Sequence, residues 1–321
     1  MKIFADFAMP PGAMLLLQEG TAGHQLLLPL KPAASVLTKP DPDQQFATAD
    51  IAFGQPDLQA IAEAKELKWI HVSSSGITRY DNPQFRALMA ERKIAVSNSA
   101  TVYAEACAVH ALSFLLAQAR NLPVALKTRA PSGSPAWAAL RSSSTTLRGE
   151  TVLILGYGAI GKRLAELLRS FGAVVIGYRR QPRGDEGIPM VAESGLPAAL
   201  GQAGHIVNIL PDSAETRGFF DGPRFAAIRA GATFYNIGRG TTVDQTALLH
   251  ALRSGHLKAA WLDVTDPEPL PADHPLWLEP TCFITPHIAG GQGGESDLLV
   301  RHFLENFNRF LQGAPLVDRV M

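Results

Sequence analysis

The sequence predicts an α/β protein with two parallel-sheet domains, on the strength of three observations. Short apolar segments alternate with helical patterns along both halves of the chain, as is typical of parallel sheets covered by helices. A glycine-rich stretch with the pattern G-x-G-x-x-G, residues 156–161, lies between an apolar segment and a helical pattern. A final amphipathic segment, residues 295–311, follows the last expected strand. Together they indicate one nucleotide-binding sheet and a second, smaller sheet.

Bulk composition restricts the class of protein. The chain has 321 residues, which is enough for two domains, and its 46% hydrophobic and 18% charged content is typical of a globular enzyme. Lys+Arg and Asp+Glu both number 29, which argues against nucleic acid or a membrane surface as the main partner. We find no signal-peptide pattern and no uninterrupted apolar run near the about 18 residues of a membrane span. We therefore expect a cytoplasmic protein.

The first part of the chain predicts a small flavodoxin-like α/β domain. Strands are expected at residues 2–5, 25–30, 50–53, 69–72 and 94–96, and helices at 58–64 and 85–90. Residues 103–120 repeat apolar side chains at steps of three or four, which predicts a helix leading into the second part. Residues 121–150 are rich in Pro, Ser and Thr and are expected to form a loop.

The second part predicts a doubly wound Rossmann sheet. Six strands are expected, at residues 151–155, 174–178, 206–210, 233–237, 259–264 and 283–285. In residues 295–311, Leu299, Phe303 and Phe307 fall on one helical face, which we expect to pack back on the first part. The predicted domains are therefore residues 1–100 with 290–321 for the substrate, and residues 101–289 for the dinucleotide.

Each glycine of the fingerprint has a physical role. Gly156 allows a tight turn, Gly158 leaves room for a pyrophosphate, and Gly161 lets the helix pack closely on the strand. Ala159 and Ile160 begin the helix, whose free N–H groups and positive dipole end attract phosphate. The plain alternative is an ordinary glycine turn, but the strand before it and the helix after it favour dinucleotide binding.

The residues after the second strand of this domain predict NADP rather than NAD. NAD-specific folds carry an acidic residue about 20 positions after the fingerprint, where it binds the ribose hydroxyls. Here that position is Arg179, and Arg180 follows. Both arginines can make charge-assisted bonds to a 2′-phosphate. The alternative of two solvated arginines explains their charge but not the missing acid, and Glu186 lies too far along the chain to replace it.

Three polar residues on strand-end turns of the second part suggest one reaction. Arg239 presents a planar fork that suits a carboxylate, and His287 can exchange a proton with a carbonyl or hydroxyl oxygen. Glu268 can pair with His287 and raise its pKa. Any one of them alone would more simply be an ordinary surface residue. Jointly, beside a nicotinamide site, they predict hydride transfer between the cofactor and a small 2-keto or 2-hydroxy acid.

These motifs resemble the D-isomer-specific 2-hydroxyacid dehydrogenase family, close to its glyoxylate/hydroxypyruvate reductase branch. The resemblance rests on residues 103–123, 156–161, 216–217, 236–240, 263–271, 274–277 and 285–290. It implies the fold described above, a homodimer held partly through the nucleotide-binding domain, and Arg239, Glu268 and His287 as the catalytic set. It also implies further cofactor contacts from residues on strand ends: Leu210, Pro211, Ile237, Gly238, Asp263 and Gly290.

The resemblance also implies a loop that holds the substrate carboxylate through backbone N–H groups. The matching segment follows the expected strand 69–72, and Ser75, Gly76 and Ile77 are the candidates, with Arg239 and His287 as further substrate contacts. An ordinary Ser/Gly-rich turn is the alternative. No spacing of His, Cys or carboxylates suggests a metal site, and Cys107 and Cys282 are expected to be reduced thiols.

Two other functions fit the same fold. One is a cofactor-sensing binding protein, as in the C-terminal-binding corepressors of this family, although the chain has no extra tail or basic patch. The other is a dehydrogenase of a larger acid such as phosphoglycerate, a branch that often adds a regulatory domain. Selectivity among keto acids depends on pocket shape, so the physiological acid stays open at this point.

Overall fold

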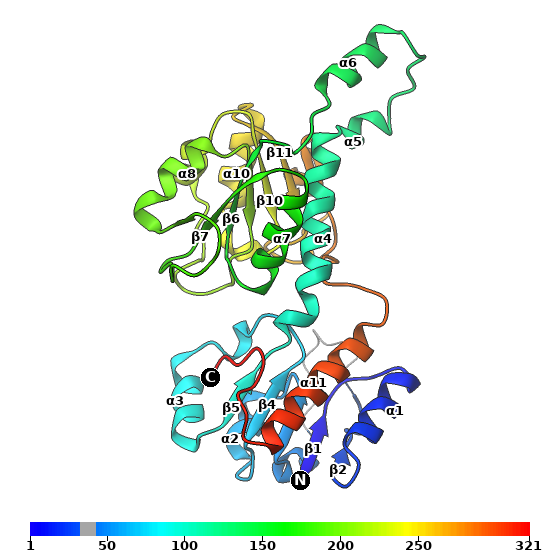
Figure 1. Cartoon of the computed structure of the whole chain (residues 1–321), viewed down its shortest axis with the longest axis vertical. Coiled ribbons are helices and arrows are strands. Elements are labelled where there is room, and N and C mark those ends of the chain that lie inside the picture. The colour runs from blue at the N-terminus through cyan, green and yellow to red at the C-terminus, as the bar shows by residue number, and fades with distance from the viewer. Residues whose placement is uncertain (33–42) are drawn as a thin grey trace. The chain divides into compact units, whose positions relative to one another are not determined.

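The structure, a computed structural model, describes residues 1–32 and 43–321 and divides the chain into two compact units (Figure 1). The first unit comprises Met1–Tyr103 and Gly291–Met321, and the second comprises Ala104–Gly290. The first boundary thus falls after Tyr103 rather than after residue 100, inside a long helix, and the return to the first unit comes at Gly291. Each unit has its own sheet and its own hydrophobic core.

The first unit contains a parallel sheet with the strand order β2-β1-β3-β4-β5. Its strands are β1 (Lys2–Ala5), β2 (Gln25–Leu27), β3 (Ile51–Gly54), β4 (Trp69–Val72) and β5 (Ala95–Ser97). This order is the flavodoxin-like one that the sequence predicted. β2 ends at Leu27 instead of residue 30, since Pro29 has no N–H to donate to a ladder.

Helices cover both faces of the first sheet. They are α1 (Pro11–Gly20), α2 (Leu58–Glu63), α3 (Pro83–Arg92) and α11 (Glu295–Leu311), with short 3₁₀ turns η1 (Gln44–Thr48) and η2 (Thr78–Tyr80). α1 was not predicted. On one face, Ile61 of α2 and Phe85 of α3 share a core with Ile70. On the other, α11 runs beside α1, and Phe303 stacks on Phe53 at a centroid distance of 4.4 Å (Figure 1). The final helix therefore packs on the first unit, as its apolar face predicted.

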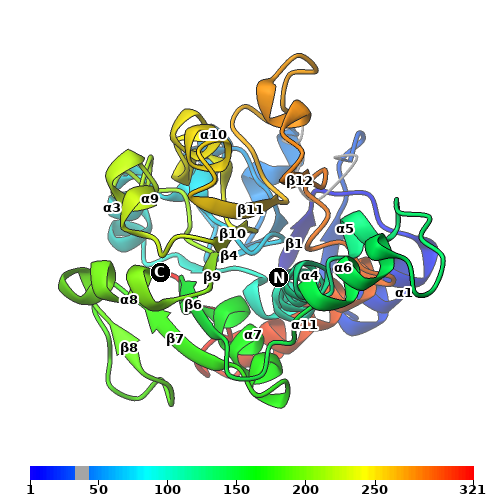
Figure 2. The same ribbon diagram turned by 90° about the horizontal axis from the view of Figure 1, so that it is seen from above.

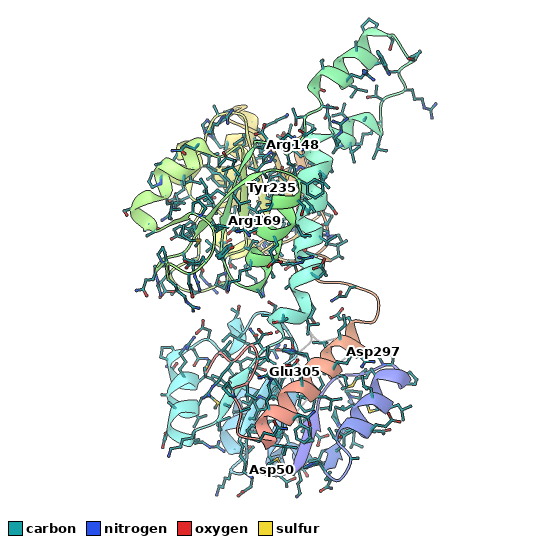
Figure 3. All side chains as sticks on the ribbon, viewed as in Figure 1. Asp50, Arg148, Arg169, Tyr235, Asp297 and Glu305 are labelled. Atoms are coloured by element: carbon teal, nitrogen blue, oxygen red, sulfur yellow. The ribbon has the colours of Figure 1, made fainter. Side chains whose placement is uncertain are left out.

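The second unit contains a parallel sheet with the order β12-β11-β10-β9-β6-β7-β8. Its strands are β6 (Thr151–Leu155), β7 (Val174–Tyr178), β8 (Met190–Val191), β9 (His205–Asn208), β10 (Ala232–Asn236), β11 (Leu257–Leu262) and β12 (Cys282–Ile284). Six of them were predicted, and the two-residue edge strand β8 was not. The order reverses between β6 and β9, and open α/β sheets bind ligands at such a reversal. Tyr235 of β10 is fully buried in this sheet (Figure 3).

Helices also cover both faces of the second sheet (Figure 2). α4 (Ala100–Ala119) and α7 (Ala159–Ser170) lie on one face, where Phe114 of α4 packs on Trp261 of β11 with ring centroids 5.0 Å apart. α8 (Leu196–Gln202), α9 (Gly222–Ala227) and α10 (Gln245–Arg253) share one core on the other face. Three 3₁₀ turns complete the unit, η3 (Glu193–Gly195), η4 (Gly240–Thr242) and η5 (Pro275–Leu278).

The expectation of a loop over residues 121–150 is wrong in part. This stretch contains two helices, α5 (Leu122–Ala125) and α6 (Pro135–Ser143). The start of α6 follows ordinary capping rules, because the Ser134 hydroxyl accepts the N–H of Trp137 and Pro135 occupies the first helical position. Arg141 then lies over the Trp137 ring, 4.7 Å from its centroid. The pair Ser134-Pro135 indicates the start of a helix, but the Pro, Ser and Thr content of residues 121–150 favoured a loop.

The helix expected at residues 103–120 is confirmed as α4, Ala100–Ala119. Although no uninterrupted apolar run reaches membrane length, α4 has the length and average composition of a membrane-crossing helix over the part of the chain that the structure describes. The core helix of a soluble protein meets the same criteria. Ala108, Ala111 and Leu115 on this helix are fully buried, so one side of α4 is taken up by packing within the fold.

Candidate active site

The turn between β6 and α7 has the shape that a pyrophosphate requires. Gly156 adopts a φ of +101°, and a Cβ there would lie 2.7 Å from the carbonyl oxygen of Ile209. A Cβ on Gly161 would lie 2.3 Å from the carbonyl oxygen of Gly156, whereas Gly158 has open space around it. Ala159 opens α7, and Gly158 before it has no side chain to cap the helix. The start of α7 thus has no side-chain cap and open space beside Gly158, so this turn fits a dinucleotide phosphate.

The strand end at β7 differs from the sequence expectation in one respect. Arg179 follows β7, and its Nη1 lies 3.4 Å from Oε1 of Glu186, whose side chain is only 2% exposed. The Glu186 carboxylate accepts the N–H groups of Arg183 at 2.7 Å and Gly184 at 2.8 Å, and the first of these bonds holds its pKa below the usual value. A tight turn thus places the Glu186 carboxylate beside Arg179, although Glu186 lies seven residues further along the chain.

Arg180, the next residue, is in a different environment. Its side chain is 71% exposed, and its Nη1 lies 3.5 Å from Oε1 of Glu215, which is itself exposed. Such a surface pair contributes little to stability. Arg180 is therefore available to an incoming anion, while Arg179 has a buried carboxylate beside it that a 2′-phosphate would have to displace or share.

Buried amides organise the turns after β9 and β10. Asn208 accepts the N–H of Leu210 at 3.2 Å and donates to Asn236 at 3.0 Å. Asn236 accepts the N–H of Gly238 at 3.1 Å and donates to the carbonyl oxygen of Arg239, also at 3.1 Å. These two asparagines, which are at most 1% exposed, hold Leu210–Pro211 and Ile237–Gly238 at neighbouring strand ends. No sequence pattern predicted a role for these asparagines.

The glycines on both sides of Arg239 allow close packing of the backbone. A Cβ on Gly238 would lie 2.7 Å from the carbonyl oxygen of Leu210, and one on Gly240 would lie 1.9 Å from that of Thr265. The Arg239 Nη1 donates to the carbonyl oxygen of Gly238 at 2.6 Å. Burial lowers the Arg239 pKa, and the nearby Glu268 carboxylate opposes that change. Arg239 is therefore a partly buried cation on a rigid turn.

His287 and Glu268 form a hydrogen-bonded pair. The distance from Nδ1 to Oε1 is 3.0 Å, and the two side chains are 36% and 39% exposed. The hydrogen bond to Glu268 raises the His287 pKa, although burial and the charge of Arg239 oppose it. His287 also adopts a φ of +52°, a conformation that non-glycine residues rarely adopt and that often marks a functional site. The structure thus brings Arg239, Glu268 and His287 together.

Asp263 shapes the loop that carries His287. Its carboxylate, 1% exposed, accepts the N–H groups of Ile288 at 2.9 Å and Ala289 at 2.8 Å and the hydroxyl of Thr285 at 2.6 Å. Its backbone oxygen accepts the N–H of His287 at 2.9 Å. Asp263 was predicted as a cofactor contact. Its carboxylate is occupied by the loop, which ends at Gly290, the last residue of the second unit, and the cofactor contact stays a prediction.

His110 of α4 contacts this loop, and neither it nor Cys107 on the same helix had a predicted role. The His110 Nε2 lies 3.3 Å from the Thr285 hydroxyl and 3.6 Å from the Asp263 carboxylate, and burial lowers the His110 pKa. Burial also raises the pKa of the Cys107 thiol to about 12, so the thiol stays protonated. Within residues 1–32 and 43–321, no cluster of three or more His, Cys, Asp or Glu could hold a metal ion.

The loop predicted to hold the carboxylate lies in the first unit, after β4. The Ser75 carbonyl oxygen accepts the Asn98 side chain at 2.6 Å, and that of Gly76 accepts the Ser74 hydroxyl at 2.7 Å. The N–H groups of Ser75, Gly76 and Ile77 donate no hydrogen bond to the described part of the chain. Three successive donors without acceptors suit an anion.

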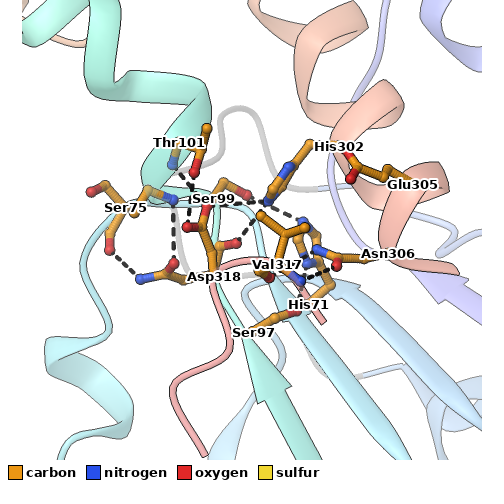
Figure 4. Close-up of polar contacts among 12 residues, drawn as sticks. His71, Ser75, Ser97, Ser99, Thr101, His302, Glu305, Asn306, Val317 and Asp318 are labelled. Atoms are coloured by element: carbon orange, nitrogen blue, oxygen red, sulfur yellow. Dashed lines mark hydrogen bonds and ion pairs between the residues drawn. The ribbon is translucent and has the colours of Figure 1, made fainter. Parts of the chain in front are cut away.

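Asp318, near the C-terminus, forms hydrogen bonds with residues that lie next to this loop (Figure 4). Asp318 accepts hydrogen bonds from the N–H and the hydroxyl of Thr101, both at 2.8 Å, at the start of α4. Its carboxylate also lies 3.3 Å from Nε2 of His302, and its carbonyl oxygen accepts the N–H of Asn98. The backbone of Asn98, whose side chain reaches Ser75, is therefore held by Asp318, which itself bonds to the start of α4.

Comparison with known proteins agrees with this geometry. A family model for the D-isomer specific 2-hydroxyacid dehydrogenase NAD binding domain matches residues 112–289. The chain is 34% identical over 257 residues to a glyoxylate reductase/hydroxypyruvate reductase of Homo sapiens, a match that covers 79% of this chain and 77% of that protein. It is also 31% identical over 268 residues to a D-3-phosphoglycerate dehydrogenase of Mycobacterium tuberculosis, but it spans only 49% of that longer protein.

Solved structures show the same fold over the full length. A D-isomer specific 2-hydroxyacid dehydrogenase from Xanthobacter autotrophicus Py2, determined in complex with NADPH and MES, is 26% identical with a TM-score of 0.79. The match covers 100% of this chain and 98% of that one. A protein of the same family from Aeromonas salmonicida is 28% identical with a TM-score of 0.78 over the same shares of both chains. The chain therefore belongs to the D-isomer specific 2-hydroxyacid dehydrogenase family.

Proposed function

We propose that this protein reduces a small 2-keto acid, of the glyoxylate or hydroxypyruvate type, to the D-2-hydroxy acid. The observation that carries the proposal is the His287–Glu268 pair, whose nitrogen and oxygen are 3.0 Å apart on the strand edge that also carries Arg239. A proton donor beside a cation that can bind a carboxylate is what such a reduction needs. The relatives named glyoxylate reductase/hydroxypyruvate reductase support the substrate class.

Each side chain has a definite part in this reaction. A bound nicotinamide cofactor supplies the hydride that reaches the carbonyl carbon. His287 donates Nδ1–H to Glu268, so Nε2 is the atom that gives its proton to the carbonyl oxygen. Arg239 binds the carboxylate and polarises the carbonyl. We assign the N–H groups of Ser75, Gly76 and Ile77 to the same carboxylate, because they have no acceptor in the described chain.

Turnover on a panel of acids tests the proposed function. Glyoxylate, hydroxypyruvate, pyruvate and phosphohydroxypyruvate should be compared with NADPH and NADH by following cofactor absorbance. We expect the highest kcat/KM with glyoxylate or hydroxypyruvate. Preference for the phosphorylated acid would support the second candidate, a phosphoglycerate dehydrogenase, which the relatives of that name favour. Tight cofactor binding without turnover of any acid would instead indicate a cofactor-sensing protein.

We further propose that the cofactor is NADP, bound through Arg179 and Arg180. The exposed Arg180 is expected to make the larger contribution, because the buried Glu186 carboxylate partly neutralises Arg179. Arg180→Ala should therefore raise KM for NADPH on the order of 10-fold, as loss of a charge-assisted hydrogen bond predicts, and leave KM for NADH unchanged. Arg179→Ala should have a smaller effect. A wild type that prefers NADH, or two variants with an unchanged cofactor ratio, would contradict the assignment.

We also propose that the enzyme works in the cytoplasm as a homodimer. The support is a group of exposed apolar side chains on α5 and next to it, Leu122, Val124 and Leu126, of which Leu126 is 83% exposed. Exposed apolar patches on soluble proteins often mark contacts with a partner.

A further inference from the structure

A chain of buried polar side chains leads from the end of β1 to the loop after β4. Asp6, 1% exposed, follows β1, and Gln55, 7% exposed, follows β3. Neither residue has a part in the chemistry described above. Burying a carboxylate and an amide costs free energy unless both find hydrogen-bond partners. Their partners show what the pair does.

Asp6 and Arg79 hold the backbone of Gln55. Both Asp6 oxygens accept the Gln55 N–H, at 3.0 and 2.8 Å, and Nη1 of Arg79 donates to the Gln55 carbonyl oxygen at 3.1 Å. Gly54 has a φ of +138°, and a Cβ there would lie 1.8 Å from an Asp6 oxygen. The end of β3 is therefore fitted closely around the Asp6 carboxylate, and the position of Gln55 follows from it.

The Gln55 side chain then reaches the loop. Its Nε2 donates to the Ser74 hydroxyl at 2.8 Å and lies 3.4 Å from that of Ser73. The Ser74 hydroxyl in turn donates to the carbonyl oxygen of Gly76 at 2.7 Å. From the other side, Asn98 donates to the carbonyl oxygen of Ser75 at 2.6 Å. Two successive carbonyl groups of the loop are thus held.

Peptide geometry relates these two held carbonyl groups to the orientation of the N–H groups that follow them. In a trans peptide, the carbonyl of one residue and the N–H of the next point in opposite directions. Holding the carbonyl of Ser75 directs the Gly76 N–H outward, and holding the carbonyl of Gly76 does the same for the Ile77 N–H. These are two of the three donors that have no acceptor in the described chain.

We propose that Gln55, held in place by Asp6, is a positioning residue that orients the N–H group of Ile77 toward the carboxylate of the acid, while Asn98 orients that of Gly76. The proposal rests on the carboxylate-binding role of this loop given under the proposed function. Gln55 acts through Ser74, so it should govern how tightly the acid binds and not how fast it reacts.

The test replaces Gln55 with leucine, which keeps the volume and removes the amide. KM for the best keto acid of the panel should rise about 10-fold, from the loss of about one well-placed hydrogen bond. The kcat value and KM for NADPH should stay within about 2-fold of wild type, on the reasoning that catalytic groups are untouched. Gln59→Leu, the same change at an exposed position of α2, serves as the control and should change neither constant.

A second readout does not depend on turnover. Amide hydrogen exchange of Ser73 and Ser99, whose N–H groups donate to the carbonyl oxygens of Gly54 and Ser74 at 3.1 Å, should accelerate in Gln55→Leu and not in Gln59→Leu, because the loop loses its support. If Gln55→Leu does not fold, Ser74→Ala removes the same connection and should raise KM for the acid in the same way. Unchanged exchange with unchanged KM for the acid would overturn the proposal.

Gly76→Pro separates this proposal from the function on which it rests, since proline has no N–H. If KM for the acid rises in Gly76→Pro but not in Gln55→Leu, the loop binds the carboxylate and the positioning role of Gln55 is refuted. If a folded Gly76→Pro variant keeps the wild-type KM, the loop does not bind the carboxylate and both statements fail. Increases in both variants support both.

Discussion

Replacing His287 with alanine is expected to lower the rate of keto-acid reduction by on the order of 100-fold or more, the usual size of general acid–base catalysis. The Nδ1–Oε1 distance of 3.0 Å to Glu268 and the raised His287 pKa support the proposed role of this imidazole as the proton donor. The measurement is kcat for the best acid at saturating cofactor. His250→Ala, an exposed histidine on α10, is the control and should retain full activity.

The proposed role of His287 also predicts the direction in which the rate changes with pH. Reduction requires imidazolium, so kcat/KM should fall as pH rises through the His287 pKa, and oxidation should fall as pH drops through it. Because the hydrogen bond to Glu268 is the largest cause of the raised pKa, Glu268→Gln should move the reductive limb to lower pH. A Glu268→Gln profile that overlays the wild type would show that the two residues do not act as a pair in catalysis.

Replacing Arg239 with lysine is expected to lower kcat/KM by roughly 10- to 100-fold. Lysine keeps the charge but loses the planar fork that binds a carboxylate through two parallel bonds, and a bond to a charged group contributes about 1.5–3 kcal/mol. The backbone should be unaffected, because Asn236 and Thr242 hold the carbonyl oxygen of residue 239 at 3.1 and 2.7 Å. Steady-state kinetics with glyoxylate and hydroxypyruvate would measure the loss.

Arg253→Lys provides the matched comparison for Arg239→Lys. Arg253 lies at the end of α10 with its side chain 59% exposed, so the same change there should leave kcat/KM at the wild-type level. Wild-type kinetics for Arg239→Lys on every good substrate would remove this residue from the site.

The sequence alone determined those features of this protein that depend only on residues close together in the chain, such as turns and amphipathic faces. The turn at residues 156–161, the strands around it and the face of α11 all come from short patterns, since turns and amphipathic faces need only local geometry. Arg239, Glu268 and His287 could be proposed in advance because each follows a strand of one parallel sheet, whose strand ends lie on a common edge. The helices α1, α5 and α6 were missed, although Ser134-Pro135 is a capping signal at the start of α6.

Only the tertiary structure decided which polar groups meet within each unit. A turn brings Glu186 back to Arg179, and the Asp263 carboxylate accepts hydrogen bonds from the loop that carries His287. Gln55 and Ser74 meet because β3 and β4 are neighbours in the sheet, a pairing that follows from the packing of the whole unit. Sequence patterns repeat every two or 3.6 residues, so they report which face of an element is buried. They do not indicate which distant side chain will lie opposite a buried donor or acceptor. Those hydrogen-bond partners set the orientation of the groups that bind and react.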